Sequence, residues 1–174
     1  VTTKQNPVKF AKKIFRVAVF GFSTSSSAAA LPLNVKTTTE ELGVDEKIAS
    51  FVLPLGMTIN MNGTAIMQVV ATLFIAGCAG YDVTLSQLIV IALLALIASA
   101  GTPAAPGAGA IILFTILSGL GYINDGALLA YSLILAINRP IEMLVTALNV
   151  VGDSATAIYV AKSEGMLNED IYNS

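Results

Sequence analysis

The chain has 174 residues, of which 55% are hydrophobic and only 11% are charged. A soluble domain carries about a quarter charged residues, so this composition indicates a membrane protein. The net charge of −2, with no tryptophan and no basic patch mixed with aromatic residues, argues against a nucleic-acid partner. With no histidine and one cysteine, the chain excludes a disulfide framework and a structural zinc site.

The charges are distributed in a way that supports the same class. Residues 48–81, 83–124 and 126–138 contain no Asp, Glu, Lys or Arg. Most helices of a soluble protein need a polar face toward water, whereas a lipid bilayer removes that need. We therefore predict an all-α, multi-pass membrane protein, in the cell membrane or an inner membrane.

The first predicted element is a hairpin over residues 7–42. Asn6-Pro7 is typical of a helix start, and an apolar helix follows to about residue 22. The serine-rich run 23–27 interrupts it, and a short helix from about Pro32 to Leu42 completes a re-entrant hairpin. Four basic side chains of its first helix are expected at the lipid headgroups, on the cytoplasmic side: Lys9, Lys12, Lys13 and Arg16.

The second predicted element is a broken transmembrane helix over about residues 45–78. Its segment 56–64 contains two Gly, two Thr and two Asn within nine residues. Unwound backbone inside a membrane is unfavourable unless its polar groups find partners. We therefore expect this segment to lie inside the protein and to serve a function.

A second re-entrant hairpin is predicted over about residues 84–120. The apolar run 85–98 is too short to cross about 30 Å of hydrocarbon at about 1.5 Å per residue. It stops at the Gly- and Pro-rich segment 99–109, and a short helix follows to residue 120. Two hairpins around a broken helix indicate a transporter binding site. The alternative is two kinked spanning helices.

The last predicted element is a long transmembrane helix over about residues 125–162, kinked at Pro140. Residues 164–174 are expected to form a polar tail in water. One face of the long helix carries most of its polar side chains, because their spacings follow the helical period. These residues are Asn138, Glu142, Thr146, Asn149 and Asp153.

Charged residues inside a membrane helix are unfavourable and usually functional. Glu142 pairs with Arg139, one turn earlier, or binds the amino group of a substrate. Asp153 caps unwound backbone or, as we favour, binds a hard cation such as Na⁺ together with Asn149 and the segment 56–64. The tip Ser25–Ser27 offers hydroxyl and amide donors that suit a carboxylate.

Four motifs carry a resemblance that covers essentially the whole chain. Asn60-Met61-Asn62-Gly63-Thr64 resembles the NMDGT motif of the glutamate-transporter family, the dicarboxylate/amino acid:cation symporters. The runs 24–27 and 106–109 resemble the tips of that family's two hairpins. The run Asn149–Asp153 is similar to the NVxGD motif of its last helix.

The resemblance implies a fold and an activity. Residues 1–163 correspond to the moving transport domain of a homotrimeric symporter, whose N-terminal scaffold lies upstream of residue 1. Such proteins are not enzymes. They carry amino acids or dicarboxylates together with Na⁺ or H⁺ by an elevator motion, with the second hairpin as the gate.

The resemblance also implies site residues. One sodium site uses carbonyls of Gly56, Asn60 and Asn149 with the Asp153 carboxylate, and a second uses the backbone of Thr58, Ser99, Ala100 and Thr102. Substrate contacts come from both tips, the broken helix and the last helix: Ser26, Ser27, Thr64, Ala105, Gly109, Glu142, Thr146 and Asn149.

Three positions depart from the family pattern. Asn62 replaces an Asp, which removes a carboxylate from a third sodium site, and Glu142 replaces a shorter Asp. Val145 stands where carriers of acidic amino acids have an Arg that binds the substrate's side chain. We therefore expect a small neutral amino acid to be preferred over an acidic one. The alternatives are a proton-coupled symporter of dicarboxylates or acidic amino acids, and a channel-like member.

Overall fold

The computed structural model describes residue 3 and residues 5–174. Within this part of the chain the regular elements are helices, apart from one isolated antiparallel bridge between Val44 and Leu167. In chain order the helices are α1 (Pro7–Thr24), α2 (Ser27–Glu40), α3 (Glu46–Ile59), α4 (Asn62–Cys78), α5 (Leu85–Ala100), α6 (Ala108–Leu120), α7 (Asp125–Ile137), α8 (Arg139–Ser163) and α9 (Glu169–Asn173).

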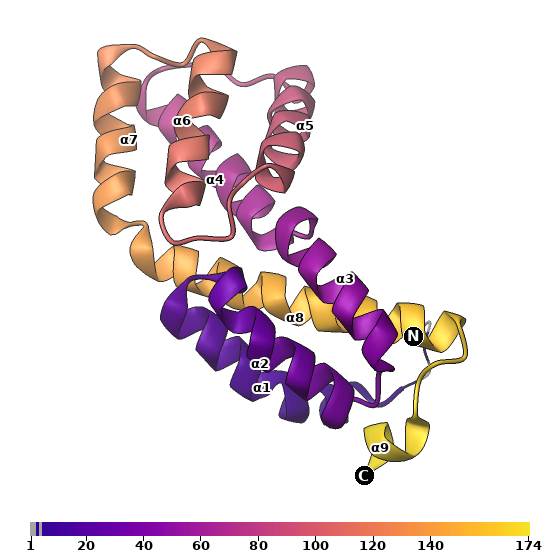
Figure 1. Ribbon diagram of the computed structural model, residues 1–174. Coiled ribbons are helices and arrows are strands. Elements are labelled where there is room, and N and C mark those ends of the chain that lie inside the picture. Colours follow the sequence, from indigo (N-terminus) through magenta and orange to yellow (C-terminus); the bar gives the residue numbers. More distant parts are fainter. Residues whose placement is uncertain (1–2, 4) are drawn as a thin grey trace.

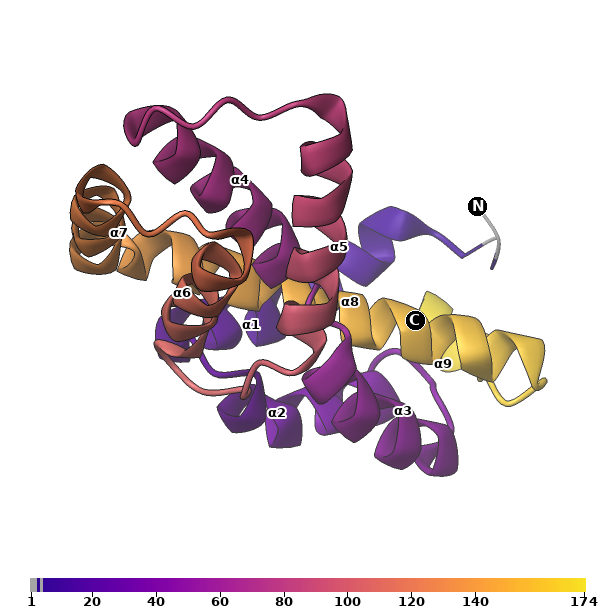
Figure 2. The ribbon, with the colours of Figure 1, turned by 90° about the horizontal axis from the view of Figure 1, so that it is seen from above.

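The long helix α8 runs through the middle of the structure (Figure 1). It contacts α1, α2, α3 and α4. Seen from above, α7 lies at one end of α8 and α9 lies toward the other (Figure 2). One polar face of α8 therefore has access to several elements that are far apart in the sequence.

Two separate apolar clusters lie on either side of the middle of the molecule. The first packs α1, α2, α3, α8 and α9 around side chains such as Val17, Leu53 and Val150. The second packs α4 to α7 around side chains such as Ile75 and Leu113. The break between α3 and α4 lies at the junction of the two clusters, and so does the polar stretch of α8.

The outer surface of the described residues fits a membrane protein. Large apolar side chains such as Phe15, Ile66 and Leu85 are exposed on it. The stretch Glu46–Cys78 and helix α8 are long and apolar enough to cross a membrane. The prediction of an all-α protein is confirmed for the described residues.

The first hairpin breaks where the serine run predicts. Asn6 caps α1 with Pro7 in its first turn, and Ser25 ends α1 in the left-handed region at a φ of 50°. The next helix begins at Ser27 rather than at the expected Pro32. The reason is that the Ser26 side chain accepts a hydrogen bond from Ala29 N and caps α2 at once.

The broken helix is confirmed. α3 ends at Ile59 and α4 begins at Asn62, with Asn60 and Met61 in non-helical conformations between them. Helices α5 and α6 lie within residues 84–120, where the second hairpin is predicted. A capping box of Thr84 and Gln87 starts α5, and Gly107 precedes α6 at a φ of 84° that favours glycine.

The prediction of one long kinked helix over residues 125–162 is wrong. Two helices, α7 and α8, meet at Asn138 with an abrupt change of direction (Figure 1). Pro140 has no N–H to continue the hydrogen-bonding of α7, and its ring restricts the residue before it. Pro140 therefore marks the interruption, which separates two helices instead of bending one.

The tail after α8 was expected to lie free in water, but it packs against the protein. Helix α9 packs Tyr172, which is only 2% exposed, into the first apolar cluster. The Lys13 ammonium donates to the carbonyls of Glu41, Ile171 and Tyr172 at 2.7–2.9 Å. Lys13 therefore binds helix ends of the protein, although it was expected at lipid headgroups.

Candidate functional site

The polar face of α8 is buried. Asn138, Glu142, Thr146, Asn149 and Asp153 are between 2% and 7% exposed. Their burial confirms that they share one face, which turns toward the protein and away from lipid. Burying this many polar groups is unfavourable unless each has a partner, so their partners define what the site can do.

The break between α3 and α4 is held against this face by Asn149. Asn149 Oδ1 accepts from Gly63 N at 2.8 Å, and its Nδ2 donates to Thr64 Oγ1 at 3.1 Å. The residue before α4, Met61, provides no side-chain cap. Asn149 therefore caps the N-terminus of α4 from another helix, which satisfies a donor that the break leaves unpaired.

Asp153 lies beside the end of α3. Its Oδ1 accepts from Asn60 Nδ2 at 2.8 Å, and a Cβ on Gly56 would come within 2.6 Å of the same oxygen. Within the described part of the chain, no Lys or Arg forms an ion pair with Asp153. A buried carboxylate without a cationic side chain beside it suits a bound cation.

The four residues expected at this first ion site lie close together. Asn60 contacts Asp153, and Asn60 Nδ2 lies 3.5 Å from the Asn149 carbonyl. The Gly56 carbonyl accepts from Asn60 N at 2.7 Å, so all four lie around the end of α3. No cluster of three or more His, Cys, Asp and Glu side chains occurs among the described residues. The site therefore offers one carboxylate with neutral oxygens, a set suited to Na⁺.

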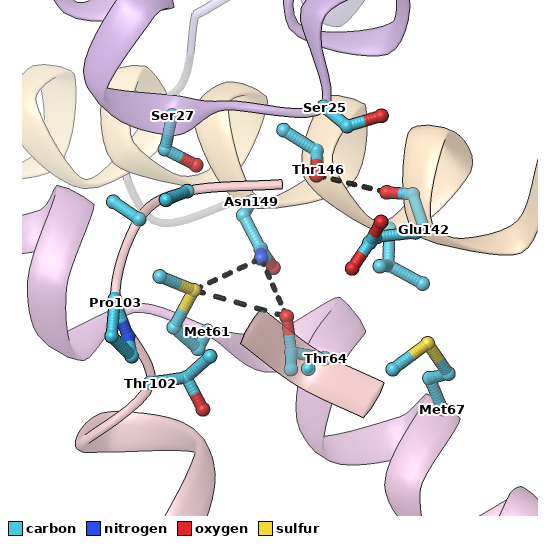
Figure 3. A pocket seen from close by; sticks show the side chains of 14 residues that line it. Ser25, Ser27, Met61, Thr64, Met67, Thr102, Pro103, Glu142, Thr146 and Asn149 are labelled. Carbon is cyan, nitrogen blue, oxygen red and sulfur yellow. Dashed lines mark hydrogen bonds between the residues drawn. The ribbon is translucent and has the colours of Figure 1, made fainter. Parts of the chain in front are cut away.

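A cavity lies next to this candidate ion site, between the tips of the two hairpins, the start of α4 and α8 (Figure 3). Its volume is about 30 Å³. At about 10–15 Å³ for each water molecule, the cavity has room for two or three. It is lined by Ser25, Ser27, Met61, Thr64, Met67, Thr102, Pro103, Ala104, Ala105, Gly109, Glu142, Val145, Thr146 and Asn149.

Three helix N-termini converge on the cavity. Ser27 opens α2, Thr64 lies in the first turn of α4, and Gly109 lies in the first turn of α6. Unpaired N–H groups and the helix dipole make each such end favourable for negative charge. Together they make the cavity favourable for an anionic group, and at α6 the Glu142 carboxylate already accepts from Gly107 N.

Glu142 supplies the only acidic side chain among the described residues that line the cavity. Its Oε1 accepts from Gly107 N at 2.9 Å, and its Oε2 pairs with Arg139 Nη1 at 3.1 Å. The Arg139 side chain is 51% exposed and does not line the cavity. The ion pair between Glu142 and Arg139 therefore exists, and it leaves Glu142 facing the cavity.

The two hairpin tips contact each other above the cavity. Ser26 Oγ donates to the Ala104 carbonyl at 2.8 Å, and Ala28 N approaches the same carbonyl at 3.4 Å. Ser26 therefore joins the tips and does not line the cavity, although it was expected to contact substrate. The other expected substrate residues line the cavity, and so does Val145: Ser27, Thr64, Ala105, Gly109, Glu142, Val145, Thr146 and Asn149.

Sequence reasoning missed four lining residues, Met61, Met67, Pro103 and Ala104, whereas Ser25 belongs to the serine tip that was expected to hold a carboxylate. Helical spacing could have found two of them, because Met61, Thr64 and Met67 are three residues apart and share one face. Thr102 was expected only at an ion site, yet it also lines the cavity.

Of the residues expected at the second ion site, Thr102 N donates to the Ser99 carbonyl at 2.9 Å, and among the described contacts no hydrogen bond joins Thr58 to the others. Thr58 is exposed and donates to Leu55 O within α3, while Ser99 is buried and donates to Leu96 O within α5. Ala100 is exposed at the end of α5. Helix α3 contacts α5, so these segments are neighbours. Asn62, at the position of the missing carboxylate, donates to Asn60 Oδ1 at 2.7 Å.

Comparison with known proteins decides the family. Residues 1–163 match the sodium:dicarboxylate symporter family. The chain belongs to this family. The match covers both hairpins, the broken helix and α8, which are the elements that build the cavity and the ion site. Members of this family are multi-pass membrane transporters, and this agrees with the apolar helices of the chain.

The curated relatives include excitatory amino acid transporters. The chain is 37% identical over 158 residues to one from Caenorhabditis elegans, covering 90% of this chain and 30% of that protein. It is 36% identical over 167 residues to excitatory amino acid transporter 2 of Homo sapiens, covering 94% of this chain and 28% of that protein. The chain thus spans about three tenths of the length of these relatives.

Proposed function

We propose that this chain is the substrate- and ion-binding part of a sodium-coupled symporter for a neutral amino acid. The observation that carries the proposal is a cavity that pairs three helix N-termini with one carboxylate. It lies beside a buried aspartate that has no cationic side chain as a partner among the described residues. The family membership of residues 1–163 supports the same class of activity.

The cavity complements both charges of an amino acid. The N-termini of α2, α4 and α6 suit its carboxylate, and Glu142 suits its ammonium group. Glu142 Oε1 already accepts from Gly107 N, so an ammonium group would replace or share this contact. A dicarboxylate without an amino group would leave Glu142 facing negative charge.

The proposed Na⁺ is cargo that binds at Asp153. A cation there compensates the buried carboxylate, and the carbonyls of Gly56, Asn60 and Asn149 complete an oxygen set. Asn149 also holds the start of α4, whose Thr64 lines the cavity. Ion binding and substrate binding therefore act on one segment, and this is the physical basis for coupling.

The side-chain end of the cavity is apolar at Val145. A second carboxylate there would be buried without a cation, which costs several kcal/mol. Arg139 provides no such cation, because it pairs with Glu142 outside the cavity. The proposed substrate is therefore neutral. The homotrimer, the elevator motion and the gating second hairpin follow only from resemblance to the family and remain part of this proposal.

The experiment is uptake of labelled alanine and aspartate by the full-length protein in liposomes, with Asp153→Asn as the variant. We expect sodium-driven alanine uptake to fall about tenfold or more, because one charged ligand contributes at least about 1.5 kcal/mol. Asp125→Asn is the matched control, since Asp125 is exposed at the start of α7.

Three outcomes would contradict the proposal. Uptake that follows a pH gradient and ignores sodium indicates a proton-coupled carrier. Preferential uptake of aspartate contradicts the role given to Val145. Ion current without saturable uptake of either compound indicates a channel-like protein.

A further inference from the structure

The polar cavity and an apolar groove beside it share one wall. The polar cavity described above and an apolar groove between α4, α7 and α8 are both lined by Met67 and Val145. The groove has a volume of about 410 Å³, against about 30 Å³ for the cavity. Its other lining residues are apolar except Asn138: Ile66, Val70, Ala71, Phe74, Ile134, Ile137 and Ile141.

Of the two shared residues, Val145 is fixed. A Cβ on Gly63 would lie 2.8 Å from the Val145 carbonyl oxygen and 2.9 Å from its Cβ. This close approach holds Val145 against the start of α4, which Asn149 also holds. A branched side chain in a helix keeps one preferred rotamer as well. Val145 therefore cannot move aside without displacing α4.

Met67 is the adaptable part of the wall. It is unbranched with three rotatable bonds, and such side chains fill irregular gaps. Its Cε lies 3.0 Å from where a Gly109 Cβ would be, a position also within 4 Å of Thr64 Cγ2 and Glu142 Oε1. Figure 3 shows Met67 on the side of the cavity where Glu142 lies. Rotation of Met67 toward the groove would join the two spaces.

We propose that Met67 is the residue that determines which substrate side chains fit, as a movable wall between the polar cavity and the apolar groove. The substrate is then a neutral amino acid whose apolar side chain is longer than that of alanine and displaces Met67 into the groove. This inference rests on the proposed function. It adds a length preference and assigns that preference to a residue on α4.

The test uses the full-length protein in liposomes with a sodium gradient, and measures kcat/KM for uptake of L-alanine, L-leucine and L-phenylalanine. Met67→Ala removes the wall, and we expect the phenylalanine-to-alanine ratio to rise about tenfold, as a few methylenes in an apolar pocket allow. Met67→Ile keeps the volume but is stiff. It should lower the leucine-to-alanine ratio about tenfold.

Met143→Ala is the matched control, because Met143 lies on α8 but lines neither the cavity nor the groove. It should leave both ratios unchanged. Thermal unfolding of each variant shows that it is folded, and Met67→Ile keeps the test valid should Met67→Ala unfold. Ratios within twofold of wild type in a folded Met67 variant would overturn this inference but would leave the proposed function standing. Absence of sodium-driven uptake of all three amino acids by the wild-type protein would overturn the proposed function and the inference with it.

Discussion

At the scale of single residues, the proposed ion site depends on a glycine that leaves room for a carboxylate. A Cβ on Gly56 would lie 2.6 Å from Asp153 Oδ1 and 3.0 Å from its Cγ. Gly56→Ala must therefore push Asp153 away from Asn60 and from the end of α3. We expect this variant to lose most of the rise in unfolding temperature that Na⁺ gives the full-length protein. The reason is that Na⁺ raises this temperature only if it binds the folded state.

Gly77→Ala provides the matched control, because a Cβ on Gly77 meets nothing within 4 Å. Both glycines lie in helices of the same broken segment. The measurement is the unfolding temperature across a sodium titration, with choline replacing sodium at constant ionic strength. If the unfolding temperature of Gly56→Ala responds to sodium as the wild type does, Asp153 is not a ligand of the ion.

At the scale of elements, the sequence predicts the breaks better than the directions of the helices. The breaks within residues 23–27, 56–64 and 99–109 depend on local chemistry, because clustered residues of the types Ser, Gly, Asn and Pro disfavour a continuous helix. A single Pro does not suffice, since Pro32 lies inside α2 and Pro54 inside α3. Pro140 marks the turn between α7 and α8, but the direction of α7 relative to α8 depends on the packing of α7 onto α4, which no local pattern encodes. The docking of α9 likewise depends on residues more than 150 positions apart.

Lys13 stabilises the docking of α9, and its contribution to the free energy of unfolding can be measured. Its ammonium donates to the last carbonyls of α2 and α9, at Glu41, Ile171 and Tyr172, where the helix dipole also favours a cation. Lys13→Met keeps the apolar stem and removes all three donors. We expect it to lower the free energy of unfolding by about 1.5–3 kcal/mol and to expose α9 to proteolysis.

Lys12→Met is the control, because Lys12 is exposed one position earlier on α1. Limited proteolysis of the full-length protein, followed by mass spectrometry of the C-terminal fragments, measures the release of α9. Equal cleavage after α8 in both variants would show that Lys13 is not needed, and that buried Tyr172 and the backbone bonds of Gly43 and Asp45 hold the segment in place.

At the scale of the whole molecule, the site lies where two apolar clusters meet along α8. The motifs predict its polar members, such as Thr64, Asn149 and Asp153, because polar residues inside a membrane stand out in a sequence. Apolar members such as Met67 and Ala104 resemble any other lipid-facing or core residue until the two clusters are assembled. The cavity therefore forms only when the elements are assembled, because the two hairpin tips that close it come from different clusters.

The contact between the tips limits access to the cavity. Ser26 Oγ donates to the Ala104 carbonyl at 2.8 Å, and the cavity beneath has a volume of only about 30 Å³. An amino acid needs more space, so the tips must separate before one binds. Ser26→Cys and Ala104→Cys, linked by a short bis-methanethiosulfonate, should therefore abolish uptake by the full-length protein, and a reductant should restore it.

The background for this experiment needs Cys78→Ser, because Cys78 is exposed and would also react. Each single-cysteine variant, treated in the same way, reports the effect of modification without a link. The decisive comparison is substrate uptake before crosslinking, after it and after reduction, with the linked fraction measured on a gel. If fully linked protein still transports, the tips do not need to part, and the substrate enters past Met67 from the side of the groove.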